Sequence, residues 1–518
     1  MDTQTEQLLE LMLHLKQATP AAAKQILNSQ PQIAYKLISL MVSMNAIDID
    51  VFQYSPHPGI ARSTPRANFF ASRAERALFS VRDGLSHNAS AEALARTWAR
   101  GTLIGGLAGE RDDGSLTFIH TDHTARDMLE IVKAHGRDKL QYWGFSYGSV
   151  LGATFAAMFP NNVERLIIDG VVDSENYYAT EWSNNLRDTD AAYRSFAVGC
   201  AAAGPSGCPF HAHNANEILS NIDALAESLR SRPIPVKTAT SYGLVDYSVL
   251  RSTIFKALYS PHAAFPRLAK ALADLRDGNA TGIWAMSVSG ALKPFDCACG
   301  AADPFESVDE ATWAVLCNDG DRIPPGYDEF EAHYKALSRT SSFADQWELP
   351  RMGCLAWPKF KKTNFQGPFV ANTSFPLLFI GNTADPVTPL WSYVPELISP
   401  TPPTLFSAHK MSKGFAGSVV LTQDSAGHCS LSAPSTCTAK IIRAYFLEGK
   451  LPEPGTVCDI DRPVFPVAAG YKPNTDGERL QAAFRVTTSS REVKEEDRKL
   501  AGVLEELAMT FRVPGLGL

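Results

Sequence analysis

The sequence has no long apolar run, since no stretch approaches the roughly 20 residues that a membrane-spanning helix needs. Its net charge is a mild -7 over 518 residues, which indicates neither a nucleic-acid-binding platform nor binding to an anionic membrane surface. No internal repeat is visible. The first residues, MDTQTEQLLELMLHLKQ, lack the basic-then-apolar layout of a signal peptide. What is left is an ordinary globular chain, long enough for two or three domains.

The sequence also lacks the pattern of a cysteine–histidine metal site. None of the nine cysteines belongs to a C-x-x-C pair with partner histidines, and His211 and His213 have no further ligands nearby. We therefore predict no metal and no cofactor. The loop-like contexts of the cysteines are more typical of disulfides in a secreted protein, and sequons compatible with secretion occur at Asn88, Asn279 and Asn372. Cysteines and amino terminus thus indicate different compartments, so no localisation is assigned.

The pattern of apolar residues divides the chain. Apolar strands alternate with helices from about residue 121 to 177, and this alternation resumes near residue 371. The intervening residues 178–370 carry helical patterns such as ANEILSNIDALAESLRS. We predict an α/β fold with a mostly parallel sheet, whose core comprises residues 54–177 and 371–470 and whose insertion forms a helical cap. Residues 1–53 are predicted as a helical appendage, and 471–518 as a tail with a solvated helix.

Residues 143–149, WGFSYGS, contain Gly-x-Ser-x-Gly, the spacing of a nucleophile elbow. In this turn the glycines let neighbouring backbone approach closely, and the following helix directs its first N–H groups at an oxyanion beside the serine. An apolar strand, KLQYW, precedes the motif, and a small-residue helix follows it. The context predicts Ser146 as nucleophile and the backbone N–H of Tyr147 as one oxyanion donor. The alternative is a serine in a glycine-rich turn.

A serine nucleophile needs a base, and the base needs an orienting carboxylate. α/β hydrolases supply them in the order Ser, Asp, His. Asp385 follows the strand PLLFI, and His428 follows the strand SVVLTQ, so both lie beyond the carboxyl ends of strands, where open α/β sheets place their sites. We predict a triad of Ser146, Asp385 and His428. The alternatives are a turn-forming Asp385, an exposed loop histidine at 428, and Asp169 or Asp173 as the acid.

Three stretches resemble the tripeptidyl-aminopeptidase-like branch of the α/β hydrolases, which is related to the proline iminopeptidases. They are WGFSYGS, GNTADPVTP and SAGHCSLSAPSTCTAKIIRAYFLEGKLPEPGTVC, and the resemblance covers roughly residues 54 to 465. PHPGIARSTP is similar to the family's Asp-Pro-Arg-Gly-x-Gly-x-Ser-x-Pro segment, with His57 in place of the arginine. The resemblance implies secretion and cleavage of short peptides near a free amino terminus through an acyl-enzyme. An esterase or amidase for a small acyl metabolite and an inactive hydrolase-like domain are the alternatives.

The resemblance also implies roles for cap carboxylates and cysteines. Carboxylates of the cap would bind the substrate's α-amino group, and the candidates are Glu181, Asp188, Asp190 and Asp319. Cys437 would pair with Cys458. Cys200–Cys208 and Cys317–Cys354 look similarly paired, which leaves Cys297, Cys299 and Cys429 unassigned.

The second oxyanion donor has no evident source in the sequence. In the family a glycine-rich loop precedes the segment matched by PHPGIARSTP, but residues 25–50 contain no glycine, and the pair Gly105-Gly106 follows the match. Loss of one such donor typically costs about 2.7–4 kcal/mol of transition-state stabilisation. We therefore expect impaired activity.

Residues 8–53, LLELMLHLKQATPAAAKQILNSQPQIAYKLISLMVSMNAIDIDVFQ, resemble the hinge of the RNA-binding subunit of the cleavage stimulation factor. This resemblance implies a protein partner for residues 1–53, and a generic helical bundle is the alternative. We hypothesise that gene fusion, or an incorrectly joined gene, attached residues 1–53 to a hydrolase without its signal peptide and first strands.

Overall fold

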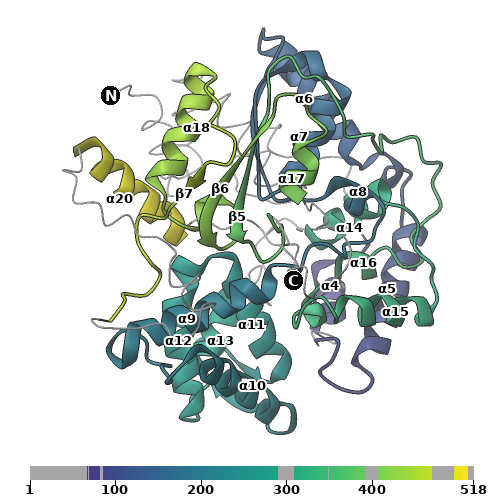
Figure 1. The fold of residues 1–518 in the computed structure, drawn as a ribbon. Helices are drawn as coiled ribbons and strands as arrows, with labels where there is room; N and C mark the ends of the chain where they lie inside the picture. The colour runs from purple at the N-terminus through teal and green to yellow at the C-terminus, as the bar shows by residue number, and fades with distance from the viewer. Residues whose placement is uncertain are drawn as a thin grey trace, which may run out of the picture.

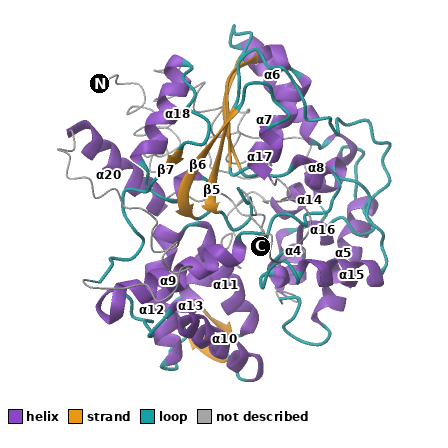
Figure 2. Ribbon diagram, in the orientation of Figure 1, coloured by secondary structure: helices purple, strands orange, loops and turns teal. Residues whose placement is uncertain are grey.

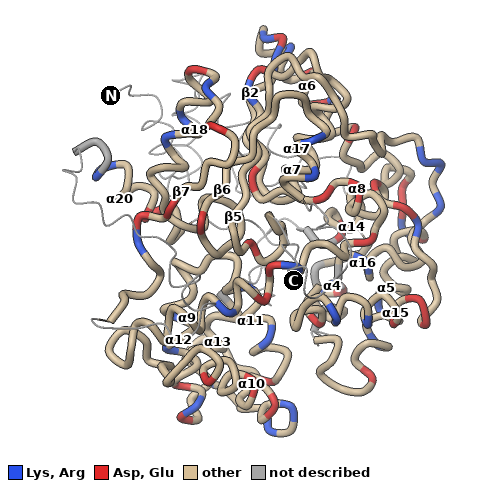
Figure 3. Tube along the Cα trace, in the orientation of Figure 1, with Lys and Arg blue, Asp and Glu red and all other residues tan. Residues whose placement is uncertain are grey.

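The computed structural model describes residues 67, 69–81, 86–289, 308–347, 349–390, 407–468 and 495–510. A sheet with flanking helices occupies one half of the molecule, and two groups of helices lie against its lower end (Figures 1 and 2). Basic and acidic residues are interspersed along the described chain (Figure 3). Outside the described residues lie the appendage 1–53, PHPGIARSTP, Cys297 and Cys299.

The central sheet has five described strands in the order β1-β2-β5-β6-β7, and all neighbouring pairs are parallel. They are β1 (Leu140–Phe145), β2 (Val163–Asp169), β5 (Leu378–Ala384), β6 (Val419–Ala426) and β7 (Val457–Cys458). These strands include the apolar runs used for the prediction, because a sheet covered on both faces needs apolar residues at nearly every position. The predicted, mostly parallel sheet is confirmed. Phe145 pairs with Asp169, and Asp169 with Ile380, so β1, β2 and β5 end at the same edge.

Alternate strand residues face two different layers of helices. Leu166 and Phe379 share a core cluster with residues of α7 (Tyr147–Met158), whereas Ile167 and Ile380 pack with Tyr445 of α18 (Thr436–Glu448). α6 (Thr121–Ala134) packs on α7, and α17 (Ser407–Ser412) contacts β5 and β6 (Figure 1). The helices thus hold the sheet between two layers, with the strand ends facing the inserted cap.

The insertion between β2 and β5 begins with the short helix α8 (Ser174–Tyr178) and then forms two groups of helices (Figure 1). The first comprises α9 (Thr189–Gly207), α10 (Ala215–Ser231), α11 (Tyr247–Tyr259), α12 (Pro261–Arg276) and α13 (Thr281–Ser289). The second comprises α14 (Val308–Asp319), α15 (Tyr327–Leu337) and α16 (Leu349–Met352). The insertion is largely helical, as expected. It also contains a hairpin that the sequence did not predict, β3 (Ile234–Lys237) and β4 (Tyr242–Val245).

Two helices that precede the sheet pack on the second cap group rather than on the strands. α4 (Arg73–Val81) and α5 (Ala93–Glu110) lie beside α14–α16 (Figure 1), and α5 contacts α15 and α16. A Cβ on Gly105 would lie 2.0 Å from the Leu355 carbonyl oxygen, so this close approach requires glycine. The boundary expected at residue 178 therefore does not separate these helices from the cap.

Three disulfides join the predicted cysteine pairs. They are Cys200–Cys208, Cys317–Cys354 and Cys437–Cys458, and Cys429 is a buried free thiol.

The charged tail forms α20 (Glu495–Thr510), but the expectation of a solvated helix was wrong on one face. Leu504 and Leu507 are buried and pack against Ala439 of α18, because apolar residues three positions apart share one side of a helix. No helix in the described part of the chain is long and apolar enough to cross a membrane.

Candidate active site

Ser146 occupies the sharp turn between β1 and α7. Its φ of 57° and ψ of -119° lie where residues with a Cβ rarely occur, and its N–H donates to the Asp169 carbonyl at 3.0 Å. A Cβ on Gly144 would lie 2.4 Å from the Gly148 carbonyl oxygen, so a side chain does not fit there. This is the strained strand–turn–helix geometry that exposes a serine hydroxyl at the end of the sheet.

Asp385 and His428 meet at the same edge of the sheet. Both are buried, and Nδ1 of His428 lies 3.0 Å from each oxygen of Asp385. The Asp385 carboxylate also accepts the backbone N–H groups of Val387 (3.0 Å), Thr388 (2.8 Å) and Cys429 (2.9 Å). Burial by itself raises the pKa of Asp385, but His428 and these N–H donors hold the pKa below its ordinary value. The ionised carboxylate can then accept a hydrogen bond from Nδ1–H and fix the ring orientation.

The other nitrogen of His428, Nε2, is buried and has no hydrogen-bond partner among the described residues. Ser146 lines a pocket together with Thr388 and Tyr259. Both of these contact His428, because Thr388 Oγ1 lies 3.2 Å from Nδ1 and the Tyr259 ring packs edge-on at a centroid distance of 5.1 Å. His428 and its partner Asp385 thus lie behind two residues, Tyr259 and Thr388, that line the pocket together with Ser146.

The pocket is walled mainly by aromatic and aliphatic side chains. They come from the elbow, the cap and the loop after β5: Ser146, Tyr147, Val172, Tyr177, Trp182, Asn185, Tyr259, Leu316, Trp347, Val387 and Thr388. Small-molecule sites usually have such apolar walls with a few converging polar groups. Sequence reasoning missed the aromatic residues of the cap, since nothing in the sequence distinguishes them from ordinary core residues.

The alternative acids have other partners. Asp169 accepts from Trp143 Nε1 (3.1 Å) and from Ser430 N–H (2.8 Å), and burial raises its pKa to about 6. Asp173 caps α8 and forms an ion pair with Lys410 at 2.9 Å. Within the described chain neither carboxylate contacts His428. This geometry favours Asp385 as the orienting acid.

None of the four carboxylates considered for amine binding is among the residues that line the pocket. The Glu181 side chain is exposed, and Asp190 bonds to Ser342 N–H and Oγ. Asp188 is buried, and burial together with nearby Asp385 raises its pKa to about 8. Asp319 is buried and satisfied by protein donors. The amine-binding role of Glu181, Asp190 and Asp319 stays a prediction.

One oxyanion donor can be placed. Tyr147 is the first residue of α7, where backbone N–H groups have no partner within the helix. Gly105 and Gly106 lie inside α5 and form no loop beside Ser146. Because the residues before 67 are outside the described part, a second donor from that region stays untested.

Two groups of side chains could hold a metal ion by proximity, namely His120, Asp122 and His123, and the triad pair with Cys429. In the first group His120 already contacts Asp122 directly. The positive end of the α6 helix and Arg126, which lies 3.9 Å from Asp122, would both repel a cation. In the second group Asp385 and His428 bond to each other. We assign no metal to either group.

The comparisons with known proteins agree with this fold. Residues 57–207 match the alpha/beta hydrolase fold family, and residues 400–458 match the TAP-like protein family. The chain therefore has the α/β-hydrolase fold, and it carries a segment similar to the TAP-like family near its carboxyl terminus, as predicted. Neither family match reaches residues 1–53, so the resemblance to the cleavage stimulation factor gains no support.

Individual relatives include peptidases. Serine protease Hip1 of Mycobacterium tuberculosis is 24% identical over 366 residues, which are 69% of this chain and 65% of that protein. Tripeptidyl aminopeptidase of Streptomyces lividans is 37% identical over 100 residues, 19% of this chain and 17% of the relative. Putative hydrolase YuaR of Escherichia coli is 24% identical over 343 residues, which are 64% of this chain and 61% of that protein. The chain thus matches less than two thirds of the length of each.

Proposed function

We propose that this hydrolase cleaves acyl bonds by nucleophilic attack of Ser146. His428 Nε2 takes the hydroxyl proton while Oγ bonds to the substrate carbonyl carbon, and the oxyanion accepts the Tyr147 N–H. The imidazolium, paired with Asp385, then protonates the leaving group, and an acyl-enzyme remains. A water molecule loses a proton to His428, attacks the acyl carbon and releases the acid and free Ser146.

The observation that carries this proposal is the orientation of His428. Nδ1 is bonded to Asp385, whereas Nε2 is buried beside the pocket that Ser146 lines and has no hydrogen-bond partner among the described residues. A buried nitrogen without a partner is costly to a fold. Its presence here is explained if it exchanges a proton with the serine and the substrate.

A fluorophosphonate probe tests the nucleophile directly. We expect labelling of the wild-type protein and complete loss in Ser146→Ala, because only an activated serine reacts with the phosphonate at a useful rate. Ser228→Ala is the matched control, since Ser228 lies on α10 and is not among the pocket-lining residues. A folded wild-type protein that stays unlabelled, or labelling that survives in Ser146→Ala, would contradict the proposal.

We further propose short peptides with a free amino terminus as substrates. The relatives named as a serine protease and a tripeptidyl aminopeptidase support a peptide, and the residues that the cap adds to the pocket wall could restrict it to a short chain end. Glu181 is the preferred amine-binding candidate. It precedes the pocket residue Trp182 in the chain, and no hydrogen bond to its carboxylate occurs among the described residues.

The substrate class is tested with an aminoacyl-anilide and its N-acetylated form. Preference for the free amine, reduced in Glu181→Gln but kept in the control Glu217→Gln on α10, would support amine recognition at Glu181. Equal cleavage of both anilides would refute amine recognition. Rapid turnover of a simple acyl ester with no cleavage of either anilide would instead identify an esterase, because the elbow chemistry does not distinguish esters from amides.

A further inference from the structure

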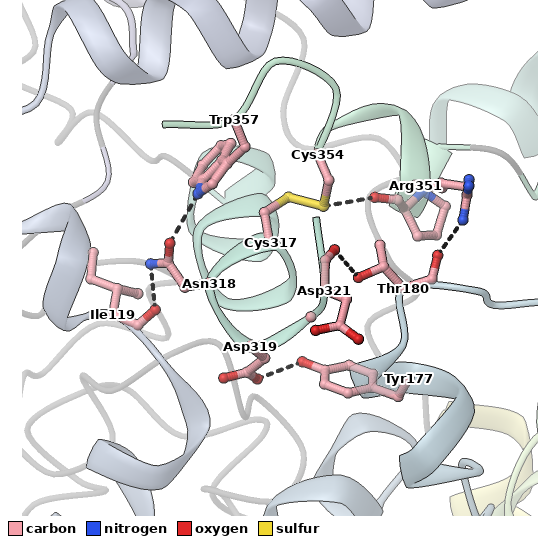
Figure 4. Close-up of a disulfide and its surroundings, with 12 residues drawn as sticks. Ile119, Tyr177, Thr180, Cys317, Asn318, Asp319, Asp321, Arg351, Cys354 and Trp357 are labelled. Carbon is pink, nitrogen blue, oxygen red and sulfur yellow. Dashed lines mark hydrogen bonds between the residues drawn. A yellow bond between two sulfur atoms is a disulfide. The ribbon is translucent and has the colours of Figure 1, made fainter. Parts of the chain in front are cut away.

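Asp319, the last residue of α14, joins the cap to the core of the hydrolase. Its side chain is fully buried. Oδ1 accepts the Thr121 N–H at 2.8 Å, and Oδ2 accepts Tyr177 OH at 2.8 Å and Thr121 Oγ1 at 2.5 Å. Figure 4 shows the carboxylate turned toward Tyr177 at the end of the α14 helix. Three donors from α6 and α8 therefore meet on one carboxylate.

The network continues to the residue after the nucleophile. The Thr121 hydroxyl also contacts Tyr147 OH. An ionised carboxylate only accepts hydrogen bonds, so Thr121 donates its single hydroxyl proton to Asp319 and accepts from Tyr147. Tyr147 thus donates to Thr121, and Thr121 donates to Oδ2 of Asp319. Tyr177 donates to the same Oδ2. Tyr147 and Tyr177 both line the pocket beside Ser146, with ring centroids 5.9 Å apart.

The backbone around Asp319 is held from the opposite side. Its carbonyl oxygen accepts from Asn364 Nδ2 at 3.2 Å and from Gln366 Nε2 at 3.1 Å. Two residues earlier, the Cys317–Cys354 disulfide joins α14 to the segment after α16, as Figure 4 shows. Asp319 is therefore a fixed point against which two pocket side chains are oriented.

We propose that Asp319 is a positioning residue of the active site, whose ionised carboxylate orients Tyr147 and Tyr177 through hydroxyl hydrogen bonds. This inference rests on the proposed function, because Tyr147 also supplies the oxyanion N–H. With a neutral group at position 319, the hydrogen bonds that run from Tyr147 through Thr121 lose their fixed direction. The Tyr147 hydroxyl is then free to turn into the pocket, and the ring no longer stabilises the first turn of α7.

The charge on this carboxylate depends on pH. Burial raises the pKa of Asp319 to about 6, while the bonds from Thr121 and Tyr177 and the nearby His120 lower it. The titratable and charged groups around it are His120, Asp122, Tyr147, Tyr177, Tyr178, Asp321 and Lys362. Activity should therefore fall on the acid side as Asp319 is protonated near pH 6.

The test compares Asp319→Asn with Asp321→Asn, a control only two residues away. Asp321 is exposed and contacts Lys362 at 3.6 Å, outside the tyrosine network. We expect kcat/KM for a peptide anilide, and the rate of fluorophosphonate labelling, to fall about tenfold or more in Asp319→Asn, since a hydrogen bond to a charged group is lost. The contribution of Asp319 to the acid limb of the pH profile near 6 should also disappear. Asp321→Asn should keep both.

A second pair of variants covers the case in which Asp319→Asn does not fold. Thr121→Ser keeps the hydroxyl that links Tyr147 to Asp319, whereas Thr121→Val removes it at nearly constant volume. We expect wild-type kinetics from the serine variant and a loss like that of Asp319→Asn from the valine variant. Non-additive losses in the double variant would place both residues in one network. Equal kinetics in Thr121→Ser and Thr121→Val would overturn the proposal.

Near-ultraviolet circular dichroism separates this proposal from the proposed function. It reports tyrosine environments and needs no turnover. If the wild-type protein is not labelled by fluorophosphonate, the proposed function fails, and a changed tyrosine signal in Asp319→Asn and Thr121→Val would still support positioning. Spectra identical to those of Asp321→Asn and Thr121→Ser would refute it.

Discussion

Replacing Asp385 by asparagine tests the assignment of the acid with almost no change of shape. In the wild-type protein both carboxylate oxygens lie 3.0 Å from His428 Nδ1, and the same oxygens accept three backbone N–H groups. Asparagine offers one acceptor and one donor in this place. Its NH₂ group would face either the imidazole or a backbone N–H, so at least one wild-type bond becomes impossible.

One orientation of the asparagine amide keeps most of the backbone hydrogen bonds. In that orientation, His428 is forced into the other tautomer. If the amide oxygen accepts Val387 and Thr388 N–H, the NH₂ group donates to Nδ1, and the ring proton moves to Nε2. A protonated Nε2 cannot accept the serine proton. We expect kcat to fall about 10⁴-fold, which corresponds to about 5 kcal/mol of transition-state stabilisation. The free energy of unfolding should fall by only about 1–3 kcal/mol, because one buried donor is left without a partner.

The assay is turnover of an activated ester or peptide anilide, with fluorophosphonate labelling and urea unfolding measured on the same samples. Asp169→Asn and Asp173→Asn are the matched controls, since Asp169 ends the neighbouring strand β2, Asp173 follows it, and neither contacts His428 in the described structure. Each should keep far more activity than Asp385→Asn. The assignment is wrong if Asp385→Asn retains a tenth of the wild-type activity while one of the controls abolishes it.

Three further predictions concern stability. Gly105→Ala should lower the free energy of unfolding by about 1–3 kcal/mol, because its Cβ would lie 2.0 Å from the Leu355 carbonyl oxygen. Gly106→Ala, whose Cβ would have nothing within 4 Å, should be neutral or stabilising by up to ~1 kcal/mol. Equal urea midpoints for the two variants would contradict the packing of α5. Leu507→Ala should destabilise the fold by about 2 kcal/mol through the lost contact of α20 with α18, and unchanged unfolding would show that α20 does not pack there. Burial lowers the pKa of His262 to about 4, so the unfolded chain takes up its proton first as the pH falls from about 6.5 to 4. About 3 kcal/mol of stability is then lost across that window, and a His262→Gln variant with the same pH dependence of unfolding would refute this.

Much of the site was predictable because it follows from the ends of strands. Ser146, Asp385 and His428 each lie just beyond the end of a strand that contains an apolar run, and parallel strands bring their carboxyl ends together. The disulfides were predicted from the family resemblance. The rest depends on contacts between distant segments, which no local pattern records.

The packing of the Tyr259 ring on His428 joins α11 to the loop after β6, about 170 residues further on. The burial of α5 against α16 similarly depends on a partner that follows far along the chain. The hairpin β3–β4 was missed because it interrupts a long helical pattern with two short strands of four residues each. One apolar side of α20 was missed because its many charged residues suggested solvent on all faces.

The backbone N–H of His428 donates to the carbonyl oxygen of Tyr259 at 2.9 Å, so the base is attached to the last turn of a cap helix. The sheet alone therefore does not complete the catalytic geometry. A minimal hydrolase made by deleting the insertion would keep Ser146 and Asp385 but lose the carbonyl and ring that hold the histidine. Exchange of caps between related hydrolases would meet the same constraint. In the proposed mechanism the cap therefore helps to hold the base His428 in place, and any change of specificity engineered into α11 would act on reactivity as well.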